Sequence, residues 1–518
     1  MVDSILQTII KERELDKINK EKNFCFTIPK KRERSITPFL PEKGVILEIK
    51  RASPSKGDIA PSLDPSTLAI EYQKAGAAAI SILTENNYFK GSLQDIVEVA
   101  RVLDSQKGEK PAILRKDFLT DISEIDASYK VGADAVLLIA RILETERLID
   151  MAVRCADLGL GMLIELRTDE DIGKYHDVEK ALLKKGKSLD NVVAGTNTRD
   201  LATFAIDLLK PLTYGDALPK KMIFESGIHT PMGARFAGSL GFYGMLVGEA
   251  ASKNPQKAHS LVDSFLAGGT KEVFLNTIKW KQYALELGVR SYNKIEKIRL
   301  SSLKPNKTLP FVKICGITNV KDALKACELG ADFLGFISVK KSPRYVDKKT
   351  ITAICKKVRE KYSQVMCVGV ITDQNSTEGQ VAIGLATVGI LDAVQFHNCS
   401  PSGIATQDFW HYQAVKIGSR DDIANLEKVL NFGQPRVLID ANVVGKDGGT
   451  GVQISNELVS IAQKKSPLWL AGGINPENVG SVLATFSPEL IDVSSGVESS
   501  PGIKDHKKLE KLFENIRN

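Results

Sequence analysis

Three short apolar runs decide how this chain folds: VILEIK (45–50), AAISIL (78–83) and AILRKD (112–117). A longer stretch with helical periodicity separates each run from the next. Continuous apolar strands that alternate with helices are typical of a parallel sheet that is covered on its faces. This part of the chain therefore predicts an α/β fold.

The same alternation of apolar runs and helical stretches continues as far as residue 249. Five further runs complete a set of eight: AVLLIA (135–140), MLIEL (162–166), VVAGTN (192–197), KMIFES (221–226) and MLVGE (245–249). Eight strand–helix units in about 250 residues is the count of a (β/α)₈, or TIM, barrel. Residues 1–40, which precede the first run, indicate a helix followed by an irregular basic stretch, and so an N-terminal extension.

Residues 271–308 break this rhythm with a pattern typical of one long helix and then a polar linker that contains proline. Eight new runs follow: FVKICG (311–316), FLGFIS (333–338), VMCVGVIT (365–372), AVQFH (393–397), AVKIG (414–418), VLIDA (437–441), LWLAGG (468–473) and LIDVSSG (490–496). The two halves share a period but not a sequence, which favours two different barrels over a duplicated one.

We therefore predict an α/β protein of two tandem (β/α)₈ barrels, the first with an N-terminal helical extension. The expected domains are residues 1–270 and 309–518, joined by a helical linker over 271–308. The alternative is a doubly wound open sheet, but no GxGxxG motif follows the first strand of either half.

Composition limits the classes of function. The 518 residues carry a net charge of +7 that is spread along the chain, which suits anionic small molecules better than nucleic acid, although a solvated basic surface explains it equally well. The seven cysteines form no CxxC pair, so neither a disulfide framework nor a structural zinc site is expected. Reduced thiols and the lack of a signal-like or membrane-spanning segment favour the cytoplasm.

Polar residues at the ends of the first eight strands are the candidate active site, because barrel enzymes place their chemistry at the carboxyl ends of the strands. They are Glu48, Lys50, Lys116, Asp117, Glu165, Asn197, Arg199, Glu225 and Ser226. Crowded, partly desolvated lysines are expected to have a lowered pKa that suits general acid work. A ring of structural salt bridges is the alternative for any single charge, but five such strand ends favour function.

Glycines in the last two loops of the first barrel are candidate phosphate ligands. Ser226 and Gly227 follow the seventh strand, and Gly248 and Glu249 follow the eighth. Backbone N–H groups in such loops bind anions, whereas single glycines are often needed only for a turn. Glu249 is expected to act through its backbone N–H alone.

In the second barrel, Cys315 ends the first strand and Asp440 ends the sixth. A thiol and a carboxyl group on opposite sides of a sugar can act as base and acid, although a lone cysteine in a strand is more often a buried filler. Arg344 follows the second strand and can bind a carboxylate through two hydrogen bonds. His397 is expected to be structural, and the glycine-rich loop 446–451 to be a mobile cover.

Glycine and serine clusters follow the last two strands of this barrel, where such barrels bind phosphate. They are Gly472, Gly473, Ser494, Ser495 and Gly496. Nothing in the sequence indicates a metal, nicotinamide or flavin, so no cofactor is expected.

Taken in order, these motifs resemble known families. VILEIKRASPSKG (45–57), ILRKDF (113–118), IELRTDED (164–171), GTNTRDL (195–201), ESGI (225–228) and VGEA (247–250) resemble indole-3-glycerol-phosphate synthase. KICGIT (313–318), KKSPRYV (340–346), VQFH (394–397), LIDA (438–441), GGTG (448–451), LAGGINPENV (470–479) and IDVSSGVE (491–498) resemble phosphoribosylanthranilate isomerase. The fusion resembles the bifunctional enzymes of tryptophan biosynthesis.

The synthase resemblance implies residue roles in the first barrel. Lys116 is the general acid on the substrate carbonyl, Glu165 the base or proton shuttle, and Glu48, Lys50 and Asn197 orient the substrate. Ser53 and Arg199 help to hold the carboxylate or position the site, and the phosphate is bound by Ser226, Gly227, Gly248 and Glu249.

The isomerase resemblance implies that Cys315 is the base and Asp440 the acid of an Amadori rearrangement, with Arg344 on the anthranilate carboxylate. The expected partners are phosphorylated anthranilate-sugar substrates, with no nucleic acid or membrane, and the expected state is a monomer. Departures from the family pattern are Asn398, the segment VQISN after Gly451, and a longer polar stretch over 174–190.

Two alternatives remain open at this point. A histidine-pathway isomerase would need paired aspartates at strands one and five rather than Cys315 and Asp440. A phosphate-binding regulatory module would have lost the acids and bases, all of which are present.

Overall fold

The computed structural model describes residues 7–13, 27–54, 56–199, 205–217, 219–269, 275–300, 309–397, 399–404, 407–441 and 454–517, with side chains omitted for 291–300. It divides into two compact units, residues 1–204 with 210–272 and residues 205–209 with 273–518. The expected domain limits fall at residues 270–274 and 301–308, outside the described ranges, and they stay a prediction.

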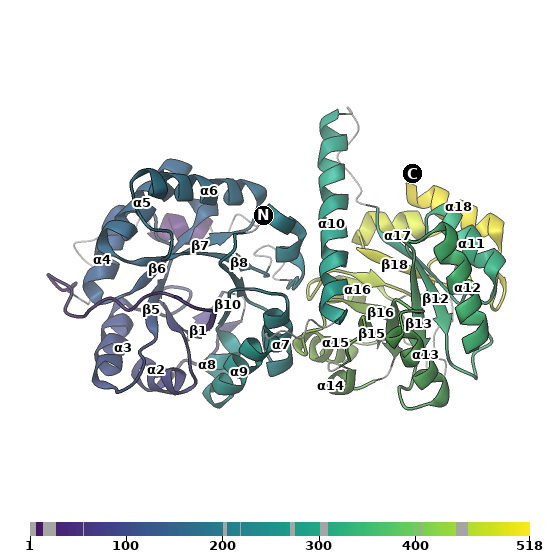
Figure 1. Ribbon diagram of the computed structural model, residues 1–518, viewed down its shortest axis with the longest axis horizontal. Coiled ribbons are helices and arrows are strands. Elements are labelled where there is room, and N and C mark those ends of the chain that lie inside the picture. The colour runs from purple at the N-terminus through teal and green to yellow at the C-terminus, as the bar shows by residue number, and fades with distance from the viewer. Residues whose placement is uncertain are drawn as a thin grey trace. The chain divides into compact units, whose positions relative to one another are not determined.

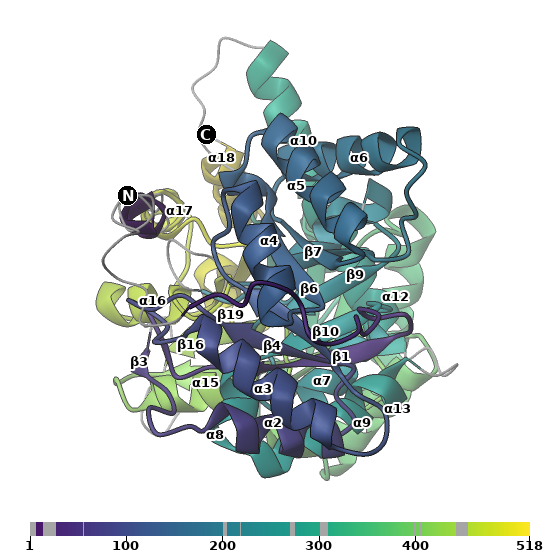
Figure 2. The ribbon, with the colours of Figure 1, turned by 90° about the vertical axis from the view of Figure 1, so that its left-hand side faces the viewer.

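The first unit contains a closed, all-parallel barrel (Figures 1 and 2). Its eight strands are β1 (Gly44–Ile49), β4 (Ala79–Leu83), β5 (Ala112–Lys116), β6 (Ala135–Ile139), β7 (Gly161–Leu166), β8 (Val192–Asn197), β9 (Met222–Glu225) and β10 (Gly244–Val247). The register of β1 against β10 and β4 closes the ring. This confirms the predicted fold, and each run found in the sequence contains its strand to within one or two residues.

Helices surround this barrel on the outside, as Figure 2 shows. They are α2 (Pro65–Lys74), α3 (Leu93–Ser105), α4 (Ile122–Val131), α5 (Thr145–Leu158), α6 (Asp169–Lys184), α7 (Pro231–Ser239), α8 (Glu249–Lys253) and α9 (Ala258–Gly268). Between β8 and β9 the described chain forms 3₁₀ turns over Lys210–Ala217 instead of an α-helix. A short hairpin, β2 (Ala52–Ser53) with β3 (Gly57–Asp58), follows β1.

Residues ahead of β1 close the amino-terminal end of the first barrel. Phe39 and Leu40 are buried in its core cluster. Arg32 and Arg34 hold Asp134 with N–O distances of 2.6 and 2.7 Å. The described part of the extension, residues 7–13, is helical, as the sequence predicts.

The second unit contains a second closed parallel barrel. Its strands are β11 (Phe311–Cys315), β12 (Phe333–Ile337), β13 (Met366–Ile371), β14 (Ala393–His397), β15 (His411–Ile417), β16 (Val437–Ala441), β17 (Trp469–Leu470) and β18 (Leu490–Val493). Two differences from the expected runs have physical reasons. β15 begins three residues early with the buried polar side chains of His411, Tyr412 and Gln413, and β17 stops before Gly472 and Gly473, both of which have positive φ.

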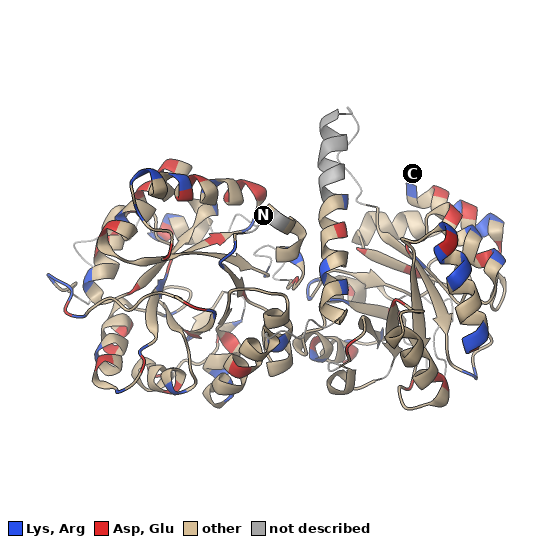
Figure 3. Ribbon diagram, viewed as in Figure 1, with Lys and Arg blue, Asp and Glu red and all other residues tan. Residues whose placement is uncertain are grey.

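The helices of this unit are α10 (Leu275–Leu300), α11 (Val320–Leu329), α12 (Lys348–Lys361), α13 (Thr377–Thr387), α14 (Pro401–Ile404), α15 (Asp422–Asn431), α16 (Asn456–Gln463), α17 (Val479–Phe486) and α18 (His506–Arg517). A small hairpin of β19 (Glu498–Ser500) and β20 (Ile503–Lys504) precedes α18. Charges of both signs cover the outer helices, α12 and α18 among them, as a solvated surface requires (Figure 3). No helix in the described ranges is long and apolar enough to cross a membrane.

An aromatic cluster closes the amino-terminal end of the second barrel. Trp280 of α10 is fully buried, with its ring centroid 5.4 Å from that of Trp410 and 6.0 Å from that of Trp469. Tyr283, one turn further along α10, lies 4.9 Å from Phe311. The helix that the sequence predicts over 271–308 thus belongs to this barrel's core.

Truncating this cluster should destabilise the second barrel selectively. We expect Trp280→Ala to lower the free energy of unfolding of that barrel by about 3–5 kcal/mol, because the cavity left by a buried indole cannot collapse. Urea unfolding followed by tryptophan fluorescence measures this, since the chain's three tryptophans all lie in the second unit. Val388→Ala, at a residue that is 69% exposed, is the control and should change stability by less than about 0.5 kcal/mol. An equal loss in both variants would contradict this account of the cluster.

Candidate functional site

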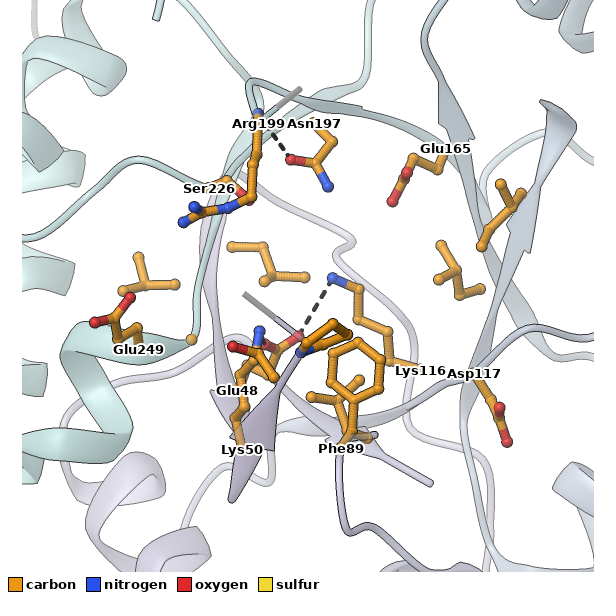
Figure 4. A pocket seen from close by; sticks show the side chains of 18 of the residues that line it. Glu48, Lys50, Phe89, Lys116, Asp117, Glu165, Asn197, Arg199, Ser226 and Glu249 are labelled. Carbon is orange, nitrogen blue, oxygen red and sulfur yellow. Dashed lines mark hydrogen bonds and ion pairs between the residues drawn. The ribbon is translucent and has the colours of Figure 1, made fainter. Parts of the chain in front are cut away.

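A chain of alternating charges lies at the carboxyl end of the first barrel. The Nζ atom of Lys116, at the end of β5, is 3.3 Å from Glu48 Oε2 of β1 and 3.2 Å from Glu225 Oε2 of β9. Lys50 Nζ is 3.4 Å from the other Glu48 oxygen. Glu48, Lys50 and Lys116 line a cavity of about 190 Å³ together with Glu165, and Figure 4 shows the Lys116 ammonium pointing into it. Glu225 is not part of this lining and acts on the cavity through its ion pair with Lys116. The barrel therefore brings these strand-end groups together, as the sequence predicts.

The two lysines differ in their electrostatics. Burial lowers the pKa of Lys50, in line with the expectation. Burial acts on Lys116 in the same direction, but the carboxylates of Glu48, Glu225 and Glu165 outweigh it and raise the pKa of Lys116 well above its usual value. The expected lowering is therefore wrong for Lys116, because it counted desolvation and not the number of facing carboxylates.

The carboxyl groups around Lys116 are affected in opposite directions. Burial and the nearby Glu225 raise the pKa of Glu165 to about 7. Burial also raises the pKa of Glu48, but Lys116 and Lys50 reverse this and leave it below its usual value. A carboxyl group that titrates near neutral pH beside a firmly protonated ammonium gives this cavity both a proton acceptor and a proton donor.

The other predicted residues of the first site also line this cavity. They are Ser53, Asn197, Arg199, Ser226, Gly227, Gly248 and Glu249. The Asn197 side-chain oxygen accepts a hydrogen bond of 3.0 Å from the backbone N–H of Arg199, which fixes the turn after β8 (Figure 4). Ser226 and Gly227 both have positive φ, so the chain turns sharply after β9.

Gly248 lies against the charged cluster itself. A Cβ atom at this position would stand 2.4 Å from Glu48 Oε1. The absence of a side chain therefore lets the loop after β10 approach Glu48, which is a packing reason for glycine beside any role in binding an anion.

Glu249 does more than the sequence suggests. Its carboxylate pairs with Lys56 at 2.7 Å and with Lys253 at 2.9 Å. Burial opposes ionisation, but these hydrogen bonds lower the pKa of Glu249 to about 2. The side chain is thus an ionised anchor for two lysines, while its backbone N–H lies in the first turn of α8.

Asp117 contributes differently from its neighbours. Its carboxylate is bound by Arg115 at 3.1 Å, by Arg13 at 2.9 Å and by the hydroxyl of Thr84 at 2.6 Å. Arg13 belongs to the N-terminal helix, and Ile9 of the same helix lines the cavity. The structure thus uses Asp117 to bind the extension. Periodicity gave no sign of this, because Arg13 is more than a hundred residues away in sequence.

Other lining residues carried no signal in the sequence. The ring centroid of Phe89, in the loop after β4, lies 5.4 Å from Lys50 Nζ, which stands over the face of the ring. His229 lies in the loop after β9, and burial lowers its pKa to about 4. Both lie in loops, where the alternation of residues along a strand does not predict which way a side chain points.

A second cavity, of about 690 Å³, lies at the carboxyl end of the second barrel. Among the predicted residues it is lined by Cys315, Arg344, Asp440, Gly472, Gly473, Ser494 and Ser495. Gly496 is not part of this lining. A Cβ atom there would stand 2.1 Å from the carbonyl oxygen of Ile474, so its lack of a side chain serves the packing of the loop.

Burial dominates the electrostatics of the proposed acid and base. It raises the pKa of Asp440 to about 6, with a further contribution from Asp492. It also raises the pKa of the Cys315 thiol, where Asp492 adds to the effect and Lys313 and Lys504 oppose it. Asp440 Oδ1 accepts a hydrogen bond of 2.8 Å from the backbone N–H of Ala441.

Arg344 is held by a carboxylate that the sequence analysis did not single out. Glu498 accepts hydrogen bonds from Arg344 Nε at 2.9 Å and from Nη2 at 2.7 Å. Lys504 donates to the same carboxylate at 2.9 Å and to the backbone oxygen of Cys315 at 2.6 Å. Glu498 therefore ties the arginine that lines the cavity to the end of the strand that carries Cys315.

His397 lines this cavity, with its Nε2 atom 2.6 Å from the side-chain nitrogen of Gln395. The contact to Gln395 fits the structural role that we expected, although the ring also reaches the cavity. The glycine-rich loop 446–451 and Asn398 lie outside the described residues.

Comparisons with known proteins agree with this geometry. The family model "Indole-3-glycerol phosphate synthase" matches residues 10–263, and "N-(5'phosphoribosyl)anthranilate (PRA) isomerase" matches residues 312–515. The "Tryptophan biosynthesis protein TrpCF" of Vibrio cholerae is 31% identical, over 91% of this chain and 86% of that protein. The "Multifunctional tryptophan biosynthesis protein" of Schizosaccharomyces pombe is 30% identical, and the match covers 91% of this chain and 59% of that longer protein.

Among solved structures, phosphoribosyl anthranilate isomerase from Thermotoga maritima is 32% identical. The match covers 40% of this chain and 98% of that one, with a TM-score of 0.36.

Two barrels, each with acidic and basic side chains around a cavity at the carboxyl ends of its strands, define a bifunctional barrel enzyme. The chain belongs to the family of fused indole-3-glycerol-phosphate synthases and phosphoribosylanthranilate isomerases of tryptophan biosynthesis. Its C-terminal barrel isomerises N-(5-phosphoribosyl)anthranilate, and its N-terminal barrel then forms indole-3-glycerol phosphate with loss of CO₂ and water.

The close approach of Gly248 to Glu48 can be tested by a single methyl group. We expect Gly248→Ala to push Glu48 away from Lys116 and to lower the synthase kcat about 100-fold, as a displacement of about 1 Å in an active site does. The isomerase rate should not change. Gly173→Ala is the matched control, because a Cβ there meets nothing within 4 Å. Steady-state assays of the two reactions measure both rates. A normal synthase rate in Gly248→Ala would refute the packing argument.

Proposed function

We propose that Lys116 is the general acid of the synthase and that Glu165 is its base. The observation that carries this proposal is the position of the Lys116 ammonium inside the cavity, between Glu48 and Glu225 and near Glu165. Its raised pKa keeps Lys116 protonated at neutral pH, so that it can donate a proton to the substrate carbonyl oxygen as the ring closes.

Ring closure and aromatisation then need only proton transfers and positioning. The aryl carbon that bears the carboxylate attacks the carbonyl carbon, while the carbonyl oxygen takes the Lys116 proton. Carbon dioxide leaves, and its bonding electrons restore the aromatic ring. In the later loss of water, Glu165 accepts the proton removed from the substrate and the hydroxyl group departs with a proton. A carboxyl group with a pKa of about 7 is well matched to this exchange.

The remaining residues of the first site would bind and orient the substrate. Glu48, Lys50 and Asn197 position the reacting atoms, and Ser53 and Arg199 hold the carboxylate, as their place in the lining allows. The phosphate would bind in the loops after β9 and β10, at Ser226, Gly227, Gly248 and Glu249. Because the Glu249 side chain is ionised and paired with two lysines, its contribution would come from its backbone N–H.

In the isomerase, Asp440 would protonate the ring oxygen of the ribose and Cys315 would remove the proton from C2. Both line the second cavity, and the raised pKa of Asp440 favours its proton-bearing form. Arg344 would hold the anthranilate carboxylate through the N–H groups that Glu498 does not occupy. The phosphate would bind in the last two loops, at Gly472, Gly473, Ser494, Ser495 and Gly496.

We also infer that the enzyme acts as a monomer in the cytoplasm. The described residues that line each cavity belong to a single unit, which fits a site built within one chain. The described cysteines are free, which suits a reducing compartment. Light scattering during gel filtration tests the monomer, and a mass of two chains would contradict it.

Single substitutions should separate the two activities. We expect Lys116→Ala to abolish indole-glycerol phosphate formation while the isomerase continues, so that the aminodeoxyribulose phosphate accumulates from phosphoribosylanthranilate. Asp440→Ala should abolish the isomerase and leave the synthase active on the aminodeoxyribulose phosphate, because it removes the proton donor of the second cavity only. Loss of anthranilate-type fluorescence and appearance of the indole product measure the two steps. If either change removes both activities in a folded protein, the assignment of one site to each barrel is wrong.

The synthase should depend on pH through Glu165. A base must be ionised to act, and the pKa of Glu165 is raised to about 7. We therefore expect kcat with the aminodeoxyribulose phosphate to fall as the pH drops below about 7. Glu165→Gln should have a low rate that no longer falls as the pH drops. Glu170→Gln, at an exposed residue of α6, should keep both the wild-type rate and its fall at low pH. If kcat of the Glu165 variant still falls below about pH 7, the titration of another group causes this fall.

A further inference from the structure

Asp492 of β18 is a buried charged group at the wall of the isomerase cavity that the assigned roles leave unused. It is 8% exposed and belongs to the cavity lining. Its Oδ2 atom lies 2.5 Å from the ammonium of Lys313. Its Oδ1 atom is buried and accepts no hydrogen bond from any described residue. A buried acceptor without a partner is costly, so its retention calls for an explanation.

The partners of Lys313 hold the Asp492 carboxylate in place. Lys313 is fully buried, and its ammonium also donates to Gln395 Oε1 at 2.8 Å. The hydroxyl of Tyr412 donates to the same oxygen at 3.0 Å. Lys313 and Asp492 also face each other in the register of the neighbouring strands β11 and β18. Lys313 therefore fixes the carboxylate of a residue that lines the cavity.

Asp492 acts on both groups that are assigned to proton transfer. It makes the largest contribution of any charged group to the raised pKa of Asp440, after burial, and it also raises the pKa of Cys315. The other carboxylates in the lining besides Asp440 are Asp373, which is exposed, and Glu378, which is half-buried. Asp492 is thus the deeply buried carboxylate beside the acid and the base.

We propose that the Asp492 carboxylate is the counter-charge for the cationic imine that forms when the isomerase opens the ribose ring. This proposal rests on the proposed roles of Cys315 and Asp440. It makes Asp492 a third catalytic residue of this site, and it accounts for the oxygen that has no partner within the described chain.

The charges and atoms of the reaction show why such a group is needed. Asp440 gives its proton to the ring oxygen as the bond from C1 to that oxygen breaks, and the nitrogen lone pair forms the C1=N bond. The substrate then carries a positive charge on nitrogen. The Cys315 thiolate takes the proton from C2, the C2–H electrons form a C1=C2 bond, and the electrons of the C=N bond return to nitrogen. Transfer of a proton from the enol oxygen to C1 completes the rearrangement.

A fixed carboxylate lowers the barrier to this sequence because it meets the charge where it develops. An ion-paired carboxylate in a buried site needs no reorganisation during the reaction and is screened little by water. Lys313 neutralises part of the Asp492 charge before the reaction, which makes its burial tolerable.

Asp492→Asn in the full-length chain tests the proposal, because asparagine keeps the shape and removes the charge. We expect the isomerase kcat to fall about 100-fold, the usual effect of losing one preorganised electrostatic group, while KM changes less than about threefold. The matched control is Asp392→Asn, the same change at a residue that binds Arg359 and the Cys367 N–H outside the cavity lining. A kcat within about threefold of wild type in Asp492→Asn would overturn the proposal.

A double variant separates catalysis from neutralisation of Lys313. Asp492→Asn alone leaves the Lys313 ammonium buried without its counter-charge, which destabilises the barrel. Lys313→Gln with Asp492→Asn removes both charges. We expect this variant to fold, as judged by the tryptophan fluorescence of the second unit, and to remain about 100-fold slow. Recovery of the wild-type rate would show that Asp492 serves only to neutralise Lys313, and would refute the proposal.

The pH profile of kcat/KM gives a readout that a purely structural role would not move. The active form needs the Cys315 thiolate together with protonated Asp440. Because the pKa of Cys315 lies above that of Asp440, the population of this form is level between the two values and falls on either side. The low-pH limb therefore reports Asp440, near pH 6 in the wild type, and the high-pH limb reports Cys315.

Removal of the Asp492 charge should move both limbs to lower pH, since Asp492 raises both pKa values. The other charged groups that face Asp440 are Lys416 and Lys313, and those that face Cys315 are Lys313 and Lys504. These lysines are unchanged in Asp492→Asn, so the shift can be attributed to the carboxylate. If neither limb shifts, Asp492 does not act on Asp440 and Cys315, and the proposal is contradicted.

Two further variants distinguish a failure of this proposal from a failure of the assigned roles. Cys315→Ala and Asp440→Asn should both abolish the isomerase. If they do and Asp492→Asn is active, only the role of Asp492 is wrong. If either of them remains active, the assignment of base and acid fails first.

Discussion

Closure of a parallel sheet on itself is the constraint on which the rest of this protein depends. In a closed barrel all eight strands end at the same rim, so polar residues that are far apart in sequence meet over one cavity. The strand ends of β1, β5 and β9 bring Glu48 and Glu225 within ion-pair distance of Lys116. Inside such a rim a charge is stable only if it is paired, so the ion pairs that permit burial also set the protonation of the site.

The opposite end of each barrel also has to be closed, and the two barrels do this in different ways. The first uses Phe39 and Leu40 from the chain ahead of β1, held in place by arginines on Asp134. The second uses Trp280 and Tyr283 of the helix α10, which pack on aromatic residues that begin its strands. Segments that look like an extension and a linker in the sequence are therefore parts of the two cores.

Sequence patterns predict what regular strands determine and miss what loops and distant pairs determine. The eightfold rhythm was sufficient for both barrels, because buried parallel strands appear as apolar runs and their polar ends mark the rim. It missed the start of β15, where His411 and Gln413 are buried in spite of their polarity. It also missed Glu498 and Asp492, because their importance lies in pairing with Arg344 and Lys313, and no local spacing reports such a contact.

The same limit explains why the expected electrostatics of Lys116 were wrong. Desolvation can be anticipated for any residue at a strand end, whereas the number of carboxylates that face it depends on closure of the ring. Once closure is known, the two sites follow one principle. Buried carboxylates favour the proton-bearing form of each proposed acid: Glu48 and Glu225 do so for Lys116, and Asp492 adds to burial for Asp440. An ammonium and a carboxyl group, which differ by several pKa units in water, are thereby both shifted towards the form that can donate a proton. Two barrels of different sequence thus favour proton donation in the same way, through acidic neighbours that only the folded chain brings together.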